Sequence, residues 1–210
     1  MGRATGGAGG YADAVIGNRA PFLWLCGPPG VGKSSVGYEL FSQVYRSGIK
    51  AGYLDFDQVG LCYPPPDDDP GNHRVKAQNL GAVWPTYRAA GARCLIAAGS
   101  AGTRETVRMY ADMVPDTKLT LCRLRAGRDQ LTERVFRRGL GRGPVIPGPI
   151  ASKSVQQLAA MAAAAAREAT ELDAADFADL CVDTGDRSVM DVVRLIRARA
   201  GQWPQLSANL

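Results

Sequence analysis

The chain has 210 residues, of which 46% are hydrophobic and 21% are charged, and its formal net charge is +5. This length suits one α/β domain with a full core, and the composition is that of an ordinary globular protein. The moderate positive charge is compatible with a nucleic-acid surface, but an anionic nucleotide substrate accounts for it equally well. No apolar run reaches about 18 residues, so no membrane span is predicted.

The pattern near the N-terminus predicts a strand, a glycine-rich turn and a helix in succession. Residues 21–26 form a short apolar run, and residues 35–45 repeat apolar side chains at helical spacing before Gly48. Between them lies Gly27-Pro28-Pro29-Gly30-Val31-Gly32-Lys33-Ser34, which matches G-x-x-x-x-G-K-[ST] without a mismatch. A preceding strand and a following helix are the context that a phosphate-binding loop, or P-loop, requires.

The remainder of the chain alternates between predicted strands and predicted helices. Further strands are expected over residues 50–57, 93–99, 118–124 and 178–183, and further helices over residues 74–91, 103–113, 129–138, 152–173 and 188–200. Residues 58–73 and 139–150 are rich in proline or glycine and are expected to form loops. The alternation predicts an α/β fold with a parallel sheet and helices on both of its faces.

We expect a single domain over residues 19–204, with a flexible tail over residues 1–18 and a short C-terminal tail over residues 205–210. Two segments inside the domain are candidates for substrate handling. Residues 58–92 are expected to form an insertion that binds the acceptor, and residues 139–150 a mobile lid. Ligands in such sheets bind at the carboxyl ends of the strands, where all the candidate residues below lie.

The P-loop predicts a site for ATP and Mg²⁺. The backbone amides of such a loop cradle phosphate oxygens, and the dipole of the following helix favours the same anions. Lys33 is expected to reach the β- and γ-phosphates, and the hydroxyl of Ser34 is expected to bind Mg²⁺. The predicted nucleotide-binding residues of this segment are Gly27, Pro28, Pro29, Gly30, Val31, Gly32, Lys33, Ser34 and Ser35.

Two carboxylates, Asp55 and Asp57, end the predicted second strand. Side chains two residues apart on a strand point to the same side, so both are expected to face the phosphate site. One carboxylate can hold Mg²⁺ or its water while the other accepts a proton from an attacking hydroxyl. The alternative is a strand-end turn with solvated acids.

A group of arginines precedes the predicted lid. Arg134 and Arg138 share one face of the predicted helix, and Arg142 lies in the lid itself. Arginines in this position are suited to clamp the transferring phosphoryl group once the lid closes. The alternative is a basic helix face that contacts only solvent.

Two loops after later strands supply further candidates. Gly99 and Arg104 follow the third strand, where small residues leave space for an acceptor and Arg104 is placed to hold an anionic group on it. An ordinary turn explains this segment equally well. The segment from Asp183 to Ser188, which includes Arg187, follows the fifth strand and is suited either to contact the nucleobase or to cap the last helix.

The five cysteines show no C-x-x-C pairing and have no histidine partners. Four of them, Cys26, Cys94, Cys122 and Cys181, fall in apolar strand-like runs, and Cys62 does not. We therefore expect buried, reduced thiols in a cytosolic protein and no zinc site.

The motifs together resemble those of the P-loop small-molecule kinases. The resemblance rests on the P-loop, the D-x-D pair, the L-x-x-R-x-x-x-R run over residues 131–138 and the D-x-x-x-x-S-V loop over residues 183–189. Shikimate and gluconate kinases, within the nucleoside monophosphate kinase group, are similar in layout, and so are actinobacterial ATP-binding proteins of this size. The resemblance implies a three-layer P-loop sandwich whose five-stranded parallel sheet has the order 2-3-1-4-5.

The resemblance also implies roles for individual residues. In the family pattern, Arg134 lies along the adenine, Arg138 contacts phosphates, Asp57 holds or deprotonates the acceptor hydroxyl, and Asp55 assists Mg²⁺. The segment after the third strand, Ala98-Gly99-Ser100, departs from the paired glycines of shikimate kinases, and the arginines that bind shikimate are not evident. That substrate is therefore not carried over.

These observations predict an ATP-dependent phosphotransferase that moves the γ-phosphoryl group to a hydroxyl of a small metabolite. The predicted catalytic residues are Lys33, Asp57, Arg138 and Arg142, and the acceptor is expected to contact Asp57, Gly99 and Arg104. Two alternatives stay open: a nucleoside monophosphate kinase, and a nucleotide-sensing protein without phosphotransfer. We expect a cytoplasmic monomer or homodimer whose partner is the small-molecule acceptor, without nucleic-acid or membrane partners.

Overall fold

The computed structural model describes residues 19–142 and 153–200. The predicted tails over residues 1–18 and 205–210 lie outside these residues, as does most of the predicted lid, residues 143–150. In the described part, five parallel strands form one sheet in the order β2-β3-β1-β4-β5. The predicted P-loop sandwich with strand order 2-3-1-4-5 is therefore confirmed.

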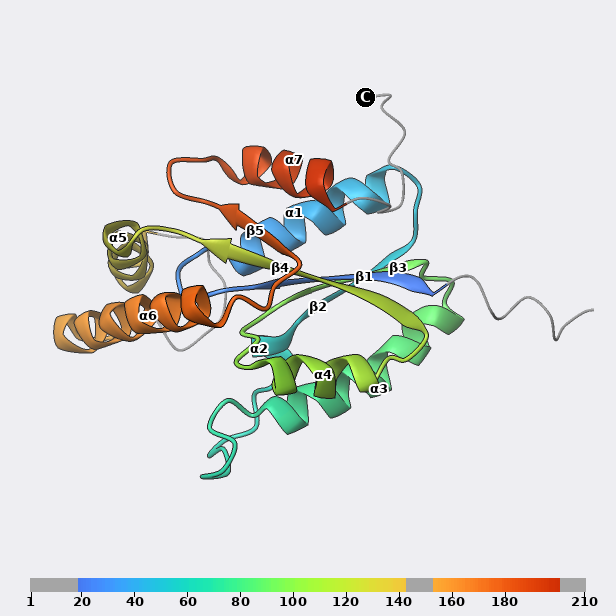
Figure 1. The fold of residues 1–210 in the computed structure, drawn as a ribbon, viewed down its shortest axis with the longest axis horizontal. Helices are drawn as coiled ribbons and strands as arrows, with labels where there is room; N and C mark the ends of the chain where they lie inside the picture. Colours follow the sequence, from blue (N-terminus) through green and yellow to red (C-terminus); the bar gives the residue numbers. More distant parts are fainter. Residues whose placement is uncertain (1–18, 143–152, 201–210) are drawn as a thin grey trace, which may run out of the picture.

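The helices surround the sheet on both faces and at one end. The strands are β1 (Ala20–Cys26), β2 (Ala51–Asp55), β3 (Cys94–Ala98), β4 (Thr117–Arg125) and β5 (Leu180–Asp183). The helices are α1 (Lys33–Arg46), α2 (Phe56–Val59), α3 (His73–Ala89), α4 (Arg104–Asp112), α5 (Arg128–Gly139), α6 (Val155–Ala175) and α7 (Val189–Arg199). Figure 1 shows α1 and α7 on one face, α2, α3 and α4 on the other, and α5 and α6 near the carboxyl end of β4. No helix in the described ranges is long and apolar enough to cross a bilayer.

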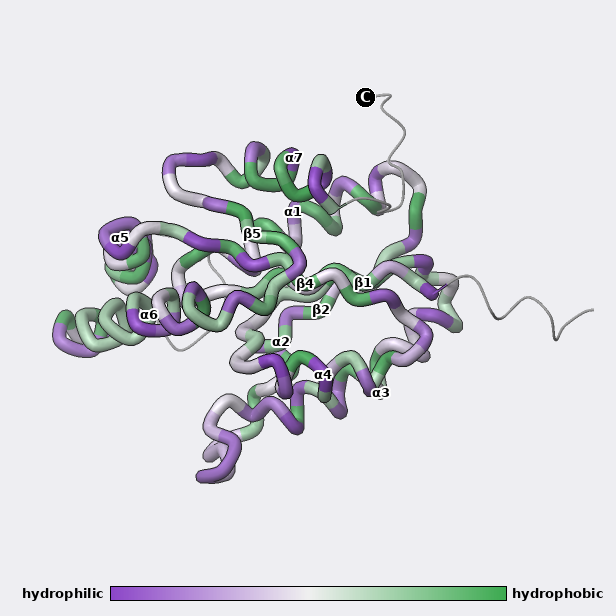
Figure 2. Tube along the Cα trace, in the orientation of Figure 1, coloured by the Kyte–Doolittle hydropathy of each residue, from purple (hydrophilic) through white to green (hydrophobic). Residues whose placement is uncertain are grey.

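The central strand β1 contributes to two hydrophobic cores because its side chains alternate between the faces of the sheet. Phe22 and Trp24 belong to the core on the α3 and α4 side, whereas Leu23 and Leu25 belong to the core on the α1 and α7 side. All four side chains are fully buried. Figure 2 shows hydrophobic residues along the strands and along α1 and α7, and a hydrophilic loop before α3.

Three buried aromatic rings fix the carboxyl edge of the sheet. The Trp24 ring lies 5.0 Å from Phe56 and 4.7 Å from Tyr110, and the centroids of Phe56 and Tyr110 are also 4.7 Å apart. The indole nitrogen of Trp24 donates a hydrogen bond to the carbonyl of Gly99 at 3.1 Å. Each aromatic pair contributes about 1 kcal/mol beyond the burial of its area. The cluster therefore holds the ends of β1 and β3, the start of α2 and helix α4 in a fixed relation.

The predicted second strand is two residues too long at its C-terminal end. Asp55 ends β2 and is the N-cap of α2, where its Oδ1 accepts the backbone amide of Asp57 at 3.0 Å. A capping carboxylate favours the start of a helix, and the fully buried Phe56 secures the turn. The expectation that Asp55 and Asp57 share one side of a strand is thus wrong, because Asp57 lies in the first turn of α2.

Two further sequence predictions also need correction. Gly139 was expected to begin the lid but is the last residue of α5, where a Cβ would lie 2.3 Å from Leu158 of α6. Glycine at this position therefore allows α5 and α6 to approach closely. Cys181 is exposed because β5 is an edge strand, whereas Cys26, Cys94 and Cys122 are buried as predicted.

Candidate active site

The P-loop joins β1 to α1, and its course depends on glycine. Gly27 has a φ of 137°, and a Cβ there would lie 2.4 Å from the carbonyl oxygen of Leu124 on β4. Gly32, directly before α1, has a φ of 102°. Residues with a side chain rarely adopt such positive φ angles. The loop brings the N-terminus of α1 to the carboxyl edge of the sheet, where helix amides favour an anion.

Lys33 is the first residue of α1 and lies over the P-loop. Its Nζ donates hydrogen bonds to the carbonyls of Gly27 at 2.7 Å and Pro28 at 3.1 Å, and the residue is only 8% exposed. Ser34 and Ser35 follow in the first turn of α1 and are half-buried. The ammonium group thus lies against the P-loop, where the motif predicts that the β- and γ-phosphates bind.

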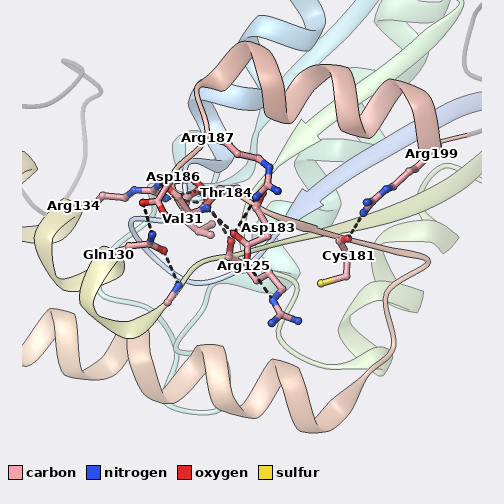
Figure 3. A network of polar contacts seen from close by, with 12 residues as sticks. Val31, Arg125, Gln130, Arg134, Cys181, Asp183, Thr184, Asp186, Arg187 and Arg199 are labelled. Carbon is pink, nitrogen blue, oxygen red and sulfur yellow. Dashed lines mark hydrogen bonds and ion pairs between the residues drawn. The ribbon is translucent and has the colours of Figure 1, made fainter.

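Arg134 of α5 connects the P-loop to the segment after β5 (Figure 3). Its guanidinium donates to the Thr184 hydroxyl at 2.9 Å and to the carbonyls of Thr184 and Gly185, both at 2.7 Å. The Thr184 hydroxyl in turn donates to the carbonyl of Val31 in the P-loop at 3.1 Å. Arg134 therefore sets the relative positions of three segments that surround the predicted nucleotide site.

The other predicted arginines lie around this network. Arg187 is exposed, and its Nη1 lies 3.7 Å from the carboxylate of Asp183 at the end of β5. Arg138 lies in the last turn of α5, one turn beyond Arg134. Arg142 follows α5 and is exposed, and its backbone amide donates to the carbonyl of Arg137 at 2.8 Å.

Asp57 is held by a lysine that sequence reasoning missed. The Nζ of Lys76 on α3 lies 3.1 Å from Asp57 Oδ1, and only 11% of the Lys76 side chain is exposed. The Asp57 side chain is 51% exposed. One oxygen of this carboxylate is therefore fixed by a largely buried cation while the group still faces solvent at the carboxyl edge.

Ser34 and Asp55 have the donor chemistry that Mg²⁺ prefers. Proteins commonly bind this ion through one or two side-chain oxygens while the phosphates of a nucleotide supply others. The hydroxyl of Tyr53 on β2 donates to the carbonyl of Ser34 at 3.3 Å, which links the strand that ends in Asp55 to the first turn of α1. The two residues thus fit a metal shared between the protein and a nucleotide.

A cavity of about 680 Å³ lies at the same edge of the sheet. Its walls come from His73 at the start of α3, from the segment between Ser100 and Glu105, and from one side of α6 between Ala164 and Ala175. This volume lies within the range of about 300–1,000 Å³ that is usual for small-molecule sites. The cavity is thus large enough for a metabolite.

The charges in the cavity connect it to the P-loop. Burial raises the pKa of Glu168 on α6 above its ordinary value of 4.5, whereas the positive charge of Lys33 lowers it. Burial and the nearby Lys76 lower the pKa of His73 below 6.5, so its ring is neutral at pH 7. The Nδ1 atom of His73 lies 3.2 Å from the hydroxyl of Tyr110. The cavity wall therefore contains a carboxylate whose pKa is affected by the charge of Lys33.

No protein-family model matches the chain, and no curated protein matches its sequence. Solved structures do match. A gluconokinase from Sinorhizobium meliloti 1021 aligns with 87% of this chain and 95% of its own, with a TM-score of 0.55 and 17% identity. The APS kinase CysC from Mycobacterium tuberculosis, in complex with AMPPNP and APS, covers 88% of this chain and 99% of its own, with a TM-score of 0.55 and 17% identity.

A third match is the tunicamycin resistance protein of Deinococcus radiodurans, which aligns with 87% of this chain and 96% of its own, with a TM-score of 0.55 and 19% identity. The chain has the fold of the P-loop small-molecule kinases. At these identities the likeness concerns the fold.

In this P-loop kinase fold, the acceptor candidates from the sequence have different surroundings. Arg104 lines the cavity as the first residue of α4. Gly99 is buried, its amide donates to the carbonyl of Leu25 at 3.1 Å, and its carbonyl accepts the Trp24 bond, so it is the next residue, Ser100, that faces the cavity. Of the expected acceptor region over residues 58–92, only His73 lines the cavity.

The wall formed by α6 was missed because its sequence is dominated by alanine. Four charged residues interrupt the alanines, and three of them, Arg167, Glu168 and Glu171, line the cavity. Glu171 is four residues after Arg167 and three after Glu168, and side chains at these spacings share one face of a helix. This spacing was the signal available in the sequence. The buried Arg123 of β4 positions this helix, because its guanidinium donates to the carbonyl of Leu172 and pairs with Asp173.

Proposed function

We propose that the protein is an ATP-dependent kinase that transfers the γ-phosphoryl group to a hydroxyl of a small molecule. The observation that carries this proposal is the position of the metabolite-sized cavity: Ser100 in its wall follows β3, and β3 pairs with β1, which leads into the P-loop. A donor site and an acceptor site at the same edge of the sheet are what phosphoryl transfer requires, because the acceptor must approach the γ-phosphate in line.

On the donor side, the P-loop from Gly27 to Ser35 would bind the phosphates of ATP. Lys33 would stabilise the charge that spreads over the transferred group, and Arg138 and Arg142 would add to it from the end of α5. Arg134 and Arg187 would border the nucleotide near the segment after β5. Mg²⁺ held by Ser34 and Asp55 would neutralise part of the phosphate charge.

On the acceptor side, the pairing of the arginines favours a hydroxyl over a phosphate. A nucleoside monophosphate acceptor would need several cations around residues 58–104. Arg74 pairs with Asp68 at 2.6 Å, and Arg88 lies 3.5 Å from Asp116. Arg93 precedes β3 and so lies at the amino edge of the sheet. Only Arg104 of these four lines the cavity, together with Arg167 of α6.

Asp57, which lies outside the cavity lining, suggests how the transfer would proceed. Asp57, with one oxygen fixed by Lys76, would accept a hydrogen bond from the attacking hydroxyl and orient it toward the γ-phosphorus.

A panel of small hydroxyl-bearing metabolites, tested for acceptor-stimulated consumption of ATP, tests the proposal. We expect one class of acceptor to raise the rate well above that of ATP alone and to yield one phosphorylated product per ADP. Stimulation only by nucleoside monophosphates would identify the alternative kinase class. Tight ATP binding without turnover with any acceptor would favour the sensor and contradict the proposal.

Replacement of Asp57 tests the acceptor side directly. Asp57→Asn should lower the transfer rate about 100-fold and leave the affinity for ATP unchanged, because an amide orients a hydroxyl less well than a carboxylate does. Asp112→Asn, an exposed change at the end of α4, is the matched control and should behave as the unmodified protein. An unchanged rate in Asp57→Asn would exclude this role.

A further inference from the structure

Glu168 lines the cavity but is not among the site residues that were predicted from the sequence. It lies on the wall formed by α6, is half-buried, and faces the cavity together with Ser100 from the loop after β3. Helix α6 is held in place by packing against α5 and by the buried Arg123. The carboxylate is thus supported by a fixed element of the cavity wall.

The charged groups around Glu168 come from several elements. Lys33 of α1 and a hydrogen bond from Ser100 favour its ionised form, whereas burial, Asp57 of α2 and Glu171 of its own helix oppose it. Arg167 of α6, Arg104 and Glu105 of α4 and His73 of α3 line the same cavity. The balance keeps the pKa of Glu168 above that of a solvated glutamate.

Asp57 and Glu168 differ in the interactions that already occupy them. Asp57 has one carboxylate oxygen engaged by Lys76 at 3.1 Å. Glu168 has no ion pair with any residue of the described ranges 19–142 and 153–200. A carboxylate that is already engaged by a cation is suited to orient a hydroxyl, and a half-buried carboxylate without such a partner is the better proton acceptor.

We propose that Glu168 is the general base of this site and that Asp57 orients the acceptor hydroxyl for it. This inference rests on the proposed kinase function. As the acceptor oxygen forms its bond to the γ-phosphorus, the bond from that phosphorus to the bridging oxygen of ADP breaks. The hydroxyl proton passes to the Glu168 carboxylate, and from there to solvent after the product leaves. Atoms and charge balance without any further reactant.

Water can replace the unknown acceptor in the test, because a kinase site hydrolyses Mg-ATP slowly when water enters the acceptor position. The rates of ADP formation from Mg-ATP alone are compared for the full chain and for Glu168→Gln, with Lys33→Met purified in parallel as the measure of contaminating activity. Glu168→Gln should lower the basal rate about 100-fold, toward the Lys33→Met background, with ATP affinity and thermal unfolding unchanged. Glu133→Gln, the same change at an exposed position of α5, is the matched control and should leave the rate unchanged.

The pH dependence separates a base from a residue that only supports the structure. The basal rate should fall as the pH decreases through the raised pKa of Glu168, since only the ionised carboxylate accepts a proton. Glu168→Gln should lose this acid limb along with most of the rate. Glu168→Asp, which keeps a carboxylate one methylene further back, should retain the limb at a reduced rate.

The outcomes for the two proposals are distinct. Basal hydrolysis in Glu168→Gln equal to that of the unmodified protein, or a Glu168→Gln protein that keeps the acid limb, would overturn the role of Glu168. A basal rate in the unmodified protein no higher than that of Lys33→Met would also overturn it. If Glu168→Gln lowers hydrolysis as expected but no metabolite stimulates ATP consumption, the base assignment holds and the kinase proposal fails.

Discussion

The donor end and the acceptor end of the site are built in different ways. At the donor end, Lys33 and Arg134 bond to backbone carbonyls of the P-loop and of the segment after β5, at distances of 2.7–3.1 Å. At the acceptor end, Arg104 and Arg167 line the cavity, and neither forms an ion pair with another described residue. The first arrangement is fixed by the fold, and the second consists of side chains that are available to a ligand.

This difference indicates which parts of the site are general and which are specific. A backbone cradle binds any nucleoside triphosphate, because it contacts only phosphates. Side chains on the surfaces of α4 and α6 can distinguish one acceptor from another, because each carries its own charge and hydrogen-bonding groups. Changes at the two ends should therefore have different consequences for ATP binding, acceptor binding and stability.

The largest effect is expected at Lys33. Lys33→Met should lower acceptor-stimulated ATP consumption about 1,000-fold, because the ammonium would stabilise charge that develops during transfer. Steady-state kinetics with the acceptor from the metabolite panel measures the change. Lys118→Met, at an exposed position near the amino end of β4, is the control and should not alter the rate. A loss smaller than tenfold would mean that Lys33 is not a catalytic group.

Arg134 should affect stability more than any other arginine of α5. Arg134→Gln removes hydrogen bonds to Thr184 and Gly185, and the free energy of unfolding should fall by about 2 kcal/mol. Urea denaturation measures this change. Arg137→Gln, an exposed position on the same helix, should change stability by less than about 0.5 kcal/mol. Equal losses in the two variants would contradict the proposed connection between the P-loop and the segment after β5.

Arg104 should affect only the acceptor end. Arg104→Gln should raise the KM for the acceptor about tenfold, which corresponds to one lost charged hydrogen bond, and leave both the KM for ATP and the stability unchanged. Arg108→Gln, one turn further along α4 and also exposed, serves for comparison. An equal rise in the KM for ATP would show that the two ends are not independent.

The smallest perturbation is chemical labelling of the cysteines. Burial raises the pKa of Cys26 to about 12 and that of Cys94 to about 11, and Cys122 is also buried with a raised pKa. A thiol reagent at pH 7.5 should therefore label only Cys62 and Cys181 in the native protein and all five cysteines in denaturant. Mass spectrometry counts the labels.

The donor end could be predicted from the sequence because its information is local. Eight consecutive residues define the P-loop, and the flanking strand and helix follow from hydrophobic spacing. The strand order came with the resemblance to known kinases and is confirmed. Local patterns of this kind report backbone conformation, and the donor end is mostly backbone.

The acceptor end could not be predicted because its contacts join distant parts of the chain. Lys76 meets Asp57 only through the packing of α3 against α2, and Glu168 reaches the cavity from a helix more than 60 residues after Ser100, which lines the same cavity. For Asp55 and Asp57, strand periodicity predicted a longer β2, whereas Asp55 is the N-cap of α2. The burial of Phe56 and the capping bond from Asp57 to Asp55 decided in favour of the helix.

The small side chains on the cavity wall have a consequence for the history of such proteins. Ala164 and Ala175 line the cavity from α6, and neither contributes to the P-loop or to the network around Arg134. Larger or polar side chains at these two positions would reshape the space for the acceptor and leave the phosphate cradle intact. Under the proposed function, a gene of this type would diverge toward new acceptors through single substitutions in one helix, while its use of ATP would be inherited unchanged.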